Sequence, residues 1–151
     1  MPIEFQHDAQ RATYEKVLPW MRDLFGDYVT VADDRPVFWV LIGSAWTSTT
    51  VYPWGDNDAT ITSRAWLVTG AELNADLLKY LLRENADMRF GAFGIDADGD
   101  ILFEHTVVGS TCDKAELRSS VQAVAFTSDK YDDEIVRRFG GTRMIDRQPQ
   151  A

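Results

Sequence analysis

The C-terminal half of the chain carries a pattern that predicts a helix, a β-hairpin and a long helix, in that order. Leucines recur at helical spacing from Leu73 to Leu82, until Asn85-Ala86-Asp87 ends the run. Two β-forming stretches then flank the turn Asp96-Ala97-Asp98-Gly99-Asp100, which predicts a hairpin. A second helical pattern ends at Phe139-Gly140-Gly141, whose glycines can adopt the left-handed conformation that closes helices. This order of elements constrains the chain to an α+β fold.

The first of these helices has an unusually wide apolar surface. We expect it to begin at Thr69, because Thr69 and Glu72 have the spacing of a capping box. Its apolar side chains cover roughly 200° of the helix, about twice the stripe that packing on one core needs. Leu78 and Leu82 lie on the far side of this arc and are our candidate homodimer interface. The competing interpretation is that another part of the same chain covers them.

The final helix is predicted to begin between Thr111 and Asp113 and to lie on a single surface. Its apolar and small residues are spaced alternately by four and three, which draws one narrow stripe. The stripe consists of Leu117, Val121, Val124, Ser128, Tyr131 and Ile135.

The aspartate-rich turn of the hairpin has a superficial likeness to a calcium loop. An EF-hand loop needs glycine at its sixth position and glutamate at its twelfth. Counting back from Gly99 puts Gly94 first and His105 twelfth, so the register does not fit. We therefore interpret the turn as structural and predict no metal site in it.

The N-terminal half predicts one helix followed by an antiparallel meander. The helical pattern runs from Tyr14 to Phe25, and Gly26 is expected to end it. Pro19 lies inside this pattern, so we expect a kink or a break near Leu18. Val37–Ile42 is apolar at every position, which is typical of a strand covered on both faces or at the centre of a sheet. The four strands are expected at about 28–32, 37–42, 46–53 and 60–68.

Trp46, Tyr52 and Trp54 share one parity of the third predicted strand. Large amphipathic rings on one face of a strand either form core beneath a helix or make an exposed surface for a ligand. Core is the safer interpretation from the sequence. The exposed alternative would make these three residues the candidate peptide-binding site.

Composition and charge limit the classes of function. The formal charge of −9 and the pI of about 4.6 argue against nucleic-acid binding. Cys112 is the only cysteine, which excludes an internal disulfide. No apolar run approaches the roughly 20 residues of a membrane span, and the N-terminus lacks the features of a signal peptide. We expect a cytoplasmic protein with no membrane association.

Direct searches for catalytic chemistry find no arrangement of residues to support it. Gly43-Ser44-Ala45 lacks the second glycine of a nucleophile elbow, and there is no phosphate-binding glycine loop. His105 shares its strand face with apolar residues, which indicates a partly buried structural histidine. Cys112 stands near a helix start without an identifiable base and is interpreted as a small apolar residue. We therefore predict no catalytic residues and no cofactor.

The chain resembles the YbjN-like proteins, which share the fold of type III secretion chaperones. The resemblance covers about residues 67–141 and rests on three features: the helix that ends at Asn85, the motif Phe90-Gly91-x-Phe93 before the Asp-Gly turn, and the run from Tyr131-Asp132 to Phe139-Gly140-Gly141. It implies a bacterial protein with a mixed sheet, helices on both faces and frequent homodimers. It also implies a role in binding peptide segments or in regulation, and it brings no catalytic residues.

The sequence thus predicts a single YbjN-like domain, 1–151, with 1–7 and 142–151 as mobile tails. Its fold is α+β, with helices packed on a mixed or antiparallel sheet. The predicted function is non-catalytic binding of a client protein or peptide segment, as a chaperone-like module. The alternative is a bacterial regulatory or scaffold protein that docks on a folded partner.

Overall fold

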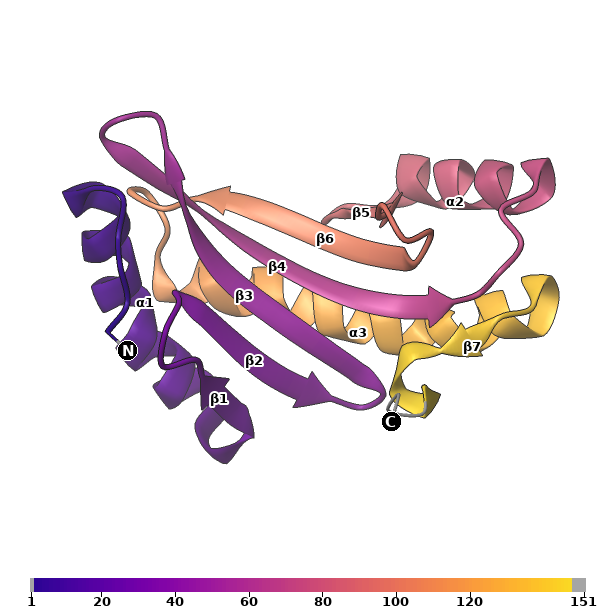
Figure 1. The fold of residues 1–151 in the computed structure, drawn as a ribbon, viewed down its shortest axis with the longest axis horizontal. Coiled ribbons are helices and arrows are strands. Elements are labelled where there is room, and N and C mark those ends of the chain that lie inside the picture. The colour runs from indigo at the N-terminus through magenta and orange to yellow at the C-terminus, as the bar shows by residue number, and fades with distance from the viewer. Residues whose placement is uncertain (1, 148–151) are drawn as a thin grey trace.

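The computed structural model describes residues 2–147, and the order of its elements agrees with the sequence-based prediction. A helix is followed by a four-stranded meander, a second helix, a hairpin and a long helix (Figure 1). The elements are α1 (Asp8–Phe25), η1 (Gly26–Tyr28), β1 (Val29–Val31), β2 (Val37–Ile42), β3 (Ala45–Trp54), β4 (Asp58–Thr69), α2 (Ala75–Asp87), β5 (Ala92–Ile95), β6 (Ile101–Val108), α3 (Lys114–Phe139), β7 (Thr142–Arg143) and η2 (Met144–Asp146).

The strands form one antiparallel sheet in the order β1-β2-β3-β4-β6-β5, and β7 adds a short pairing to the end of β4. Each pair of neighbouring strands is antiparallel, so the described sheet contains no parallel pair. β3 and β4 are the longest strands and run through the middle of the sheet (Figure 1). The α+β prediction is confirmed, and the sheet is antiparallel rather than mixed.

All three α-helices of residues 2–147 pack on the same face of the sheet. α1 and the first half of α3 bury residues such as Val17 and Val121 against Phe38 and Ile61. α2 and the second half of α3 bury residues such as Leu77 and Ile135 in a second cluster with Phe103. The expectation of helices on both faces is therefore wrong. Alternate residues of a strand point to opposite faces of the sheet, and all three helices pack against the strand residues of one face.

α3 lies across the middle of this face, as its narrow stripe predicted. Its N-cap is Asp113, and Gly140 ends it with φ of 81°. The strand positions beneath it are small, and they include Thr49 and Ser63, whose hydroxyls are 2.9 Å apart. Small residues at such positions let a helix approach the sheet closely. The stripe residues are buried except Tyr131, which is partly buried.

α1 is an uninterrupted helix of 18 residues that contains Pro19. Of the two outcomes predicted near Leu18, the break is therefore excluded, and the kink stays a prediction. Pro19 is exposed, and so is Glu15, whose carbonyl loses its helical partner because proline has no N–H. Val17 and Met21, on either side of the proline, are fully buried, and this packing holds the helix together. Gly26 ends the helix as expected.

α2 begins five residues later than its predicted capping box. Thr69 is the last residue of β4 and pairs with Thr142 of β7, so it is extended and cannot cap a helix. Asn74 is the N-cap instead, and its side chain accepts a hydrogen bond of 3.0 Å from the Leu77 N–H. Leu73 consequently lies outside the helix.

β2 is the second strand from one edge of the sheet, not a central one. Phe38 and Val40 are fully buried on the helix side, whereas Trp39 and Leu41 on the other side are only partly buried. The expectation of cover on both faces is therefore wrong. The apolar residues of β2 therefore belong to the core on one face of the sheet and to a partly exposed surface on the other.

The two predicted tails make specific contacts where the structure describes them. Phe5 packs on Tyr14 with ring centroids 5.4 Å apart, and His7 caps α1 through the Gln10 N–H. Arg143 bonds to Asp133 and Asp146. Their mobility stays a prediction, and residues 1 and 148–151 lie outside the described part of the chain.

Candidate functional site

The face of the sheet that no described α-helix covers is the most distinctive surface of the molecule. Cross-strand partners share a face, so the ladder places one row of side chains across five strands. This row runs from Trp39 to Ser48, Arg64, Glu104 and Ala92. We call this surface the open face; it comprises the row above and the residues of the same parity on β2, β3, β4 and β6.

The open face carries the aromatic residues that the sequence singled out. Trp46 is 45% exposed, Tyr52 44% and Trp54 64%, all on one side of β3. The preferred interpretation of these rings as core is therefore wrong. All three α-helices pack on the other face of the sheet. The sequence of β3 alone does not determine which of its two faces the helices cover.

Two further tryptophans complete this aromatic surface. Trp39 on β2 and Trp66 on β4 stack with ring centroids 6.5 Å apart and an interplanar angle of 29°. They reach each other across β3, over the small side chain of Ser48. The sequence analysis did not select either of them. The signal in β4 was present, because Trp66 has the parity of the polar residues Thr60, Thr62 and Arg64.

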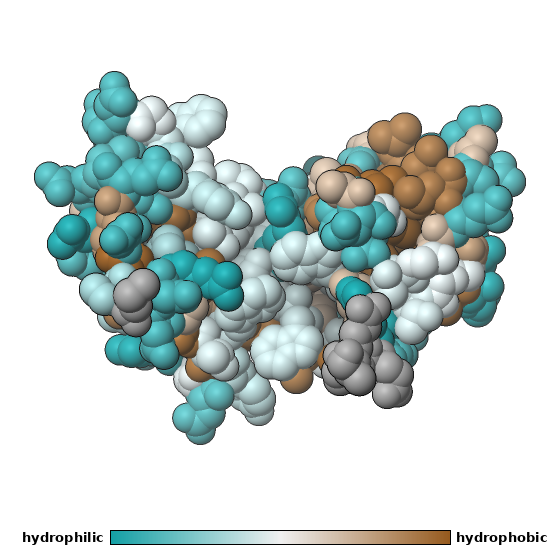
Figure 2. Space-filling model, in the orientation of Figure 1, coloured by the Kyte–Doolittle hydropathy of each residue, from teal (hydrophilic) through white to brown (hydrophobic). Residues whose placement is uncertain are grey.

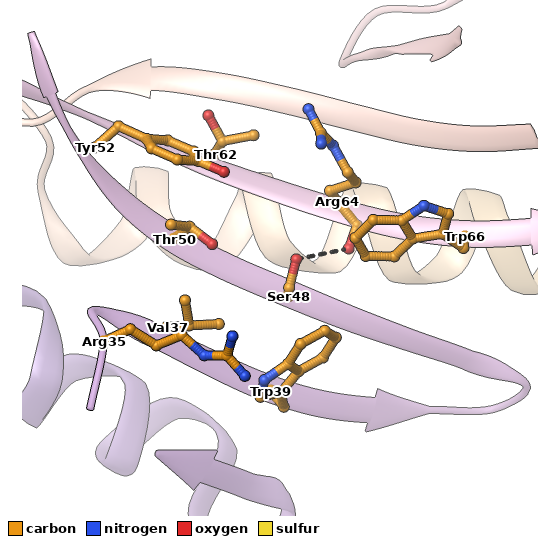
Figure 3. A pocket seen from close by; sticks show the side chains of 9 residues that line it. All are labelled: Arg35, Val37, Trp39, Ser48, Thr50, Tyr52, Thr62, Arg64 and Trp66. Atoms are coloured by element: carbon orange, nitrogen blue, oxygen red, sulfur yellow. Dashed lines mark hydrogen bonds between the residues drawn. The ribbon is translucent and has the colours of Figure 1, made fainter. Parts of the chain in front are cut away.

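A shallow hollow of about 120 Å³ lies on the open face (Figure 3). Its floor is formed by hydroxyl side chains of Ser48 and Thr50, and Tyr52 stands at the end opposite Trp39 and Trp66 (Figure 3). Pockets for small molecules usually hold about 300–1,000 Å³. The hollow is therefore of the size for one side chain of a longer ligand.

Two arginines border this hollow. Arg64 makes an ion pair with Glu104 on the neighbouring strand, with a hydrogen bond of 2.7 Å from its Nε. Within residues 2–147, the one ion-pair partner of Arg35 is the exposed Asp34 carboxylate, 3.7 Å away, a contact that contributes little stability. Arg35 is thus the charged group at this site that is most available to a ligand.

A second hollow, of about 190 Å³, continues the aromatic surface toward the C-terminus. It is lined by Ser44, Trp46 and Trp66 of the sheet region and by Met144 and Ile145 of η2. Trp46 therefore belongs to this hollow, Tyr52 to the first, and Trp54 stands exposed beyond both. The three candidate residues share one face but do not line a single cavity.

The candidate homodimer residues also lie at the surface. Leu77 and Leu81 are the buried side of α2, whereas Leu78 is 36% and Leu82 68% exposed. Figure 2 shows the most hydrophobic part of this view over α2 and β5, while the centre of the open face is pale. No part of the chain between residues 2 and 147 covers Leu82.

His105 and Cys112, two residues considered for catalysis, are packed against other parts of the fold. His105 is partly buried beneath α3, where its Nδ1 lies 2.8 Å from the Ser120 hydroxyl, and burial lowers its pKa. Burial also raises the pKa of the Cys112 thiol to about 11, which keeps it protonated at neutral pH. The predicted partial burial of His105 and the packing of Cys112 among apolar residues are confirmed.

The aspartate-rich turn joins β5 and β6 as predicted. The carboxylates of Asp96, Asp98 and Asp100 offer oxygens within 4.8 Å of one another. Asp96 accepts hydrogen bonds from the Asp98 and Asp100 N–H groups and from the Trp66 indole. Burial raises the pKa of Asp96, but these hydrogen bonds outweigh it and hold the pKa below its usual range. Its carboxylate thus organises the turn and orients Trp66.

Comparisons with known proteins agree with this fold. A crystal structure of YbjN from E. coli, described there as a proposed transcription regulator, superposes with a TM-score of 0.55 and 13% identity, over 80% of this chain and 92% of that one. At this identity the match concerns the fold alone. The comparison with curated proteins found no match. Among residues 2–147, none of the helices combines the length and hydropathy needed to cross a membrane.

A sequence family matches nearly the whole chain. Its model aligns with residues 15–147 and is described as TY-Chap1, the T3SS (YopN, CesT) and YbjN peptide-binding chaperone 1 family. This range includes α3, the hairpin and every strand of the open face. The resemblance to YbjN-like proteins with a secretion chaperone fold is confirmed, and the chain belongs to the TY-Chap1 family of peptide-binding chaperones.

Proposed function

We propose that this protein holds a segment of a client protein on the open face, without catalysing a reaction. The observation that carries the proposal is the exposure of Trp46, Tyr52 and Trp54 on a sheet face that no described α-helix covers. Exposed tryptophan and tyrosine are enriched among the residues that dominate binding energy at protein interfaces. Rings that are 44–64% exposed also forgo hydrophobic stabilisation that a bound segment would recover.

The shape of the open face favours a peptide segment over a small molecule. The two hollows, of about 120 and 190 Å³, are each of the size for one side chain. They lie on either side of Trp66, which lines both. An extended segment would place successive anchoring side chains in them, while Arg35 would attract an acidic group of the client. Affinity would come from the rings and specificity from the spacing of the hollows.

The test begins with peptides selected from a random display library on the immobilised wild-type protein. Binding of a selected peptide is then measured by tryptophan emission and fluorescence anisotropy. We expect Trp54→Ala to weaken binding about tenfold, and Tyr52→Ala with Trp46→Ala to abolish it, with the fold intact by circular dichroism. These losses are typical of aromatic interface residues.

Phe90→Ala is the matched control, because Phe90 is 45% exposed, as Trp46 is, and lines neither hollow. It should leave the affinity for the selected peptides within about twofold. Equal losses in Phe90→Ala and Tyr52→Ala would reject the open face as the site. If Trp54→Ala unfolds, the Trp54 ring is part of the core and not of a binding site.

A second candidate function is docking on a folded partner as a regulator. The description of E. coli YbjN as a proposed transcription regulator and the exposed Leu82 of α2 favour it. A regulator of this kind would lose its partner in Leu82→Glu and keep it in Trp54→Ala. The formal charge of −9 opposes direct contact with nucleic acid in either case. We therefore propose protein partners only.

A further inference from the structure

A groove of about 760 Å³ lies at one edge of the sheet, where the C-terminal end of α1 meets β2 and α3, and Leu41 is the residue of the open face that lines it. Its volume is about six times that of the hollow beside Tyr52 and falls within the range of sites that hold a ligand. None of the three candidate aromatic residues of β3 lines it. The lining residues are Asp23, Leu24, Phe25, Gly26, Asp27, Tyr28, Val40, Leu41, Ile42, Gly43 and Gln122.

The groove combines an apolar floor with an exposed aromatic rim. Leu24 and Ile42 are only partly buried in it, although both pack against the core beneath. Tyr28 stands at its edge and is 73% exposed, more than any other large hydrophobic residue of the described chain. Phe126 is 55% exposed one helical turn after Gln122 on α3. These side chains leave apolar surface in water that no described part of this chain covers.

The charged side chains that line the groove are both acidic. Among the described residues that line it there are two aspartates and no lysine or arginine. Asp23 is paired with Lys114, whereas Asp27 has no ion-pair partner within residues 2–147. Asp129 lies against Gly43, which lines the groove, and accepts hydrogen bonds from the N–H and the hydroxyl of the neighbouring Ser44. These bonds lower the pKa of Asp129, so its carboxylate is ionised at neutral pH.

We propose that this groove binds a basic amphipathic helix of a partner protein. Such a helix presents one apolar stripe with cations along its flanks. The stripe matches the floor around Leu24 and Ile42, and the flanking cations match Asp27 and, beside Gly43, Asp129. Helices bound in hydrophobic grooves use this arrangement. The groove shares only Leu41 with the open face, and its proposed role does not depend on the function proposed for that face.

The probe is a fluorescein-labelled amphipathic peptide of leucine and lysine, about 14 residues long so that it can form a helix. The same peptide with glutamate in place of lysine is the charge control. Anisotropy should show saturable 1:1 binding of the lysine peptide to the wild type and at least about tenfold weaker binding of the glutamate peptide. Absence of saturable binding by the lysine peptide would reject the proposal.

Two pairs of variants locate the site. Asp27→Lys should weaken binding about tenfold, whereas Asp56→Lys, with the same charge change on the exposed β3–β4 turn, should alter it by less than about twofold. Tyr28→Ser should weaken binding about tenfold, and Tyr52→Ser should leave it unchanged. Equal effects of the two lysine variants would show attraction to the acidic surface as a whole. A loss in Tyr52→Ser alone would place the peptide on the open face. Either result would overturn the groove.

Discussion

The two faces of the sheet are built from the same strands, yet they differ in composition and in what constrains them. On the helix side, Phe38 and Phe103 are fully buried, and hydroxyl residues such as Thr49 fit under α3. On the open face, Tyr52 and Trp54 are exposed and Thr62 bonds to Thr106 at 2.8 Å. The helix side stabilises the fold, whereas the open face leaves aromatic side chains in contact with water. Both faces carry aromatic side chains, so the presence of aromatic residues does not by itself distinguish the two faces.

The largest test of this difference compares matched aromatic residues on the two faces. Phe38→Ala should lower the free energy of unfolding by about 3–5 kcal/mol, because it removes a fully buried ring that stacks on Tyr14. Tyr52→Ala should lower it by less than about 1 kcal/mol. Urea denaturation measures both. Similar losses in the two variants would show that the open face is part of the core.

The two sides of α2 offer the same comparison on a smaller scale. We propose that Leu78 and Leu82 form a homodimer contact, since leaving each leucine in water forgoes roughly 1.5–3 kcal/mol. Sedimentation equilibrium at micromolar concentration should then show about twice the chain mass of 17.1 kDa. Leu78→Glu with Leu82→Glu should give a folded monomer. The fully buried Leu77 is the contrast: Leu77→Ala should instead cost about 2–5 kcal/mol of stability.

A wild-type protein that stays monomeric at this concentration would remove the dimer. A double glutamate variant that unfolds would show that these leucines belong to the core of their own chain.

His105 should make the helix-covered face sensitive to acid. Burial lowers its pKa in the folded protein, so below about pH 6.5 the unfolded chain binds more protons than the folded one. The resulting contribution to stability is present above that pH and is lost as the pH falls toward the folded pKa. Wild type should therefore lose more stability than His105→Gln between about pH 7 and pH 5. Parallel pH profiles of the two proteins would refute this contribution.

The smallest expected effect concerns the aspartate-rich turn at the end of the hairpin. Calcium bound only to the folded state would raise the melting temperature. We predict that this turn does not bind calcium, so millimolar calcium should leave the melting temperature unchanged. Asp96 already uses both carboxylate oxygens to accept hydrogen bonds. A clear rise in wild type, absent from Asp98→Asn, would instead establish a metal site at this turn.

Much of the fold could be predicted because it depends on local patterns. The stripe of α3, its start near Thr111 to Asp113 and its terminal glycines are all readable along the chain, and each was confirmed. The start of α2 could not be predicted in this way. Thr69 and Asn74 are both acceptable N-caps, and pairing of Thr69 with β7 decides between them. Local propensity was likewise overridden at Pro19, where the buried Val17 and Met21 keep α1 continuous.

The candidate site was predicted only in part, for a related reason. The sequence identified Trp46, Tyr52 and Trp54 as sharing one face of a strand, because strand parity is a local property. It missed Trp39 and Trp66, which come together through the pairing of β2, β3 and β4. It also could not show which face the helices cover. Trp39 in particular was hidden in a strand that is apolar throughout.

The sequence by itself determined the order of elements, the parity of each strand and the stripes of the helices, because these follow from the 3.6- and 2-residue periods of the backbone. Only the tertiary structure decided that α1, α2 and α3 pack on one face, and so which aromatic rings are core and which are exposed. Burial depends on contacts between residues far apart in the chain, and a single strand such as β3 carries no information about which of its sides a helix will cover.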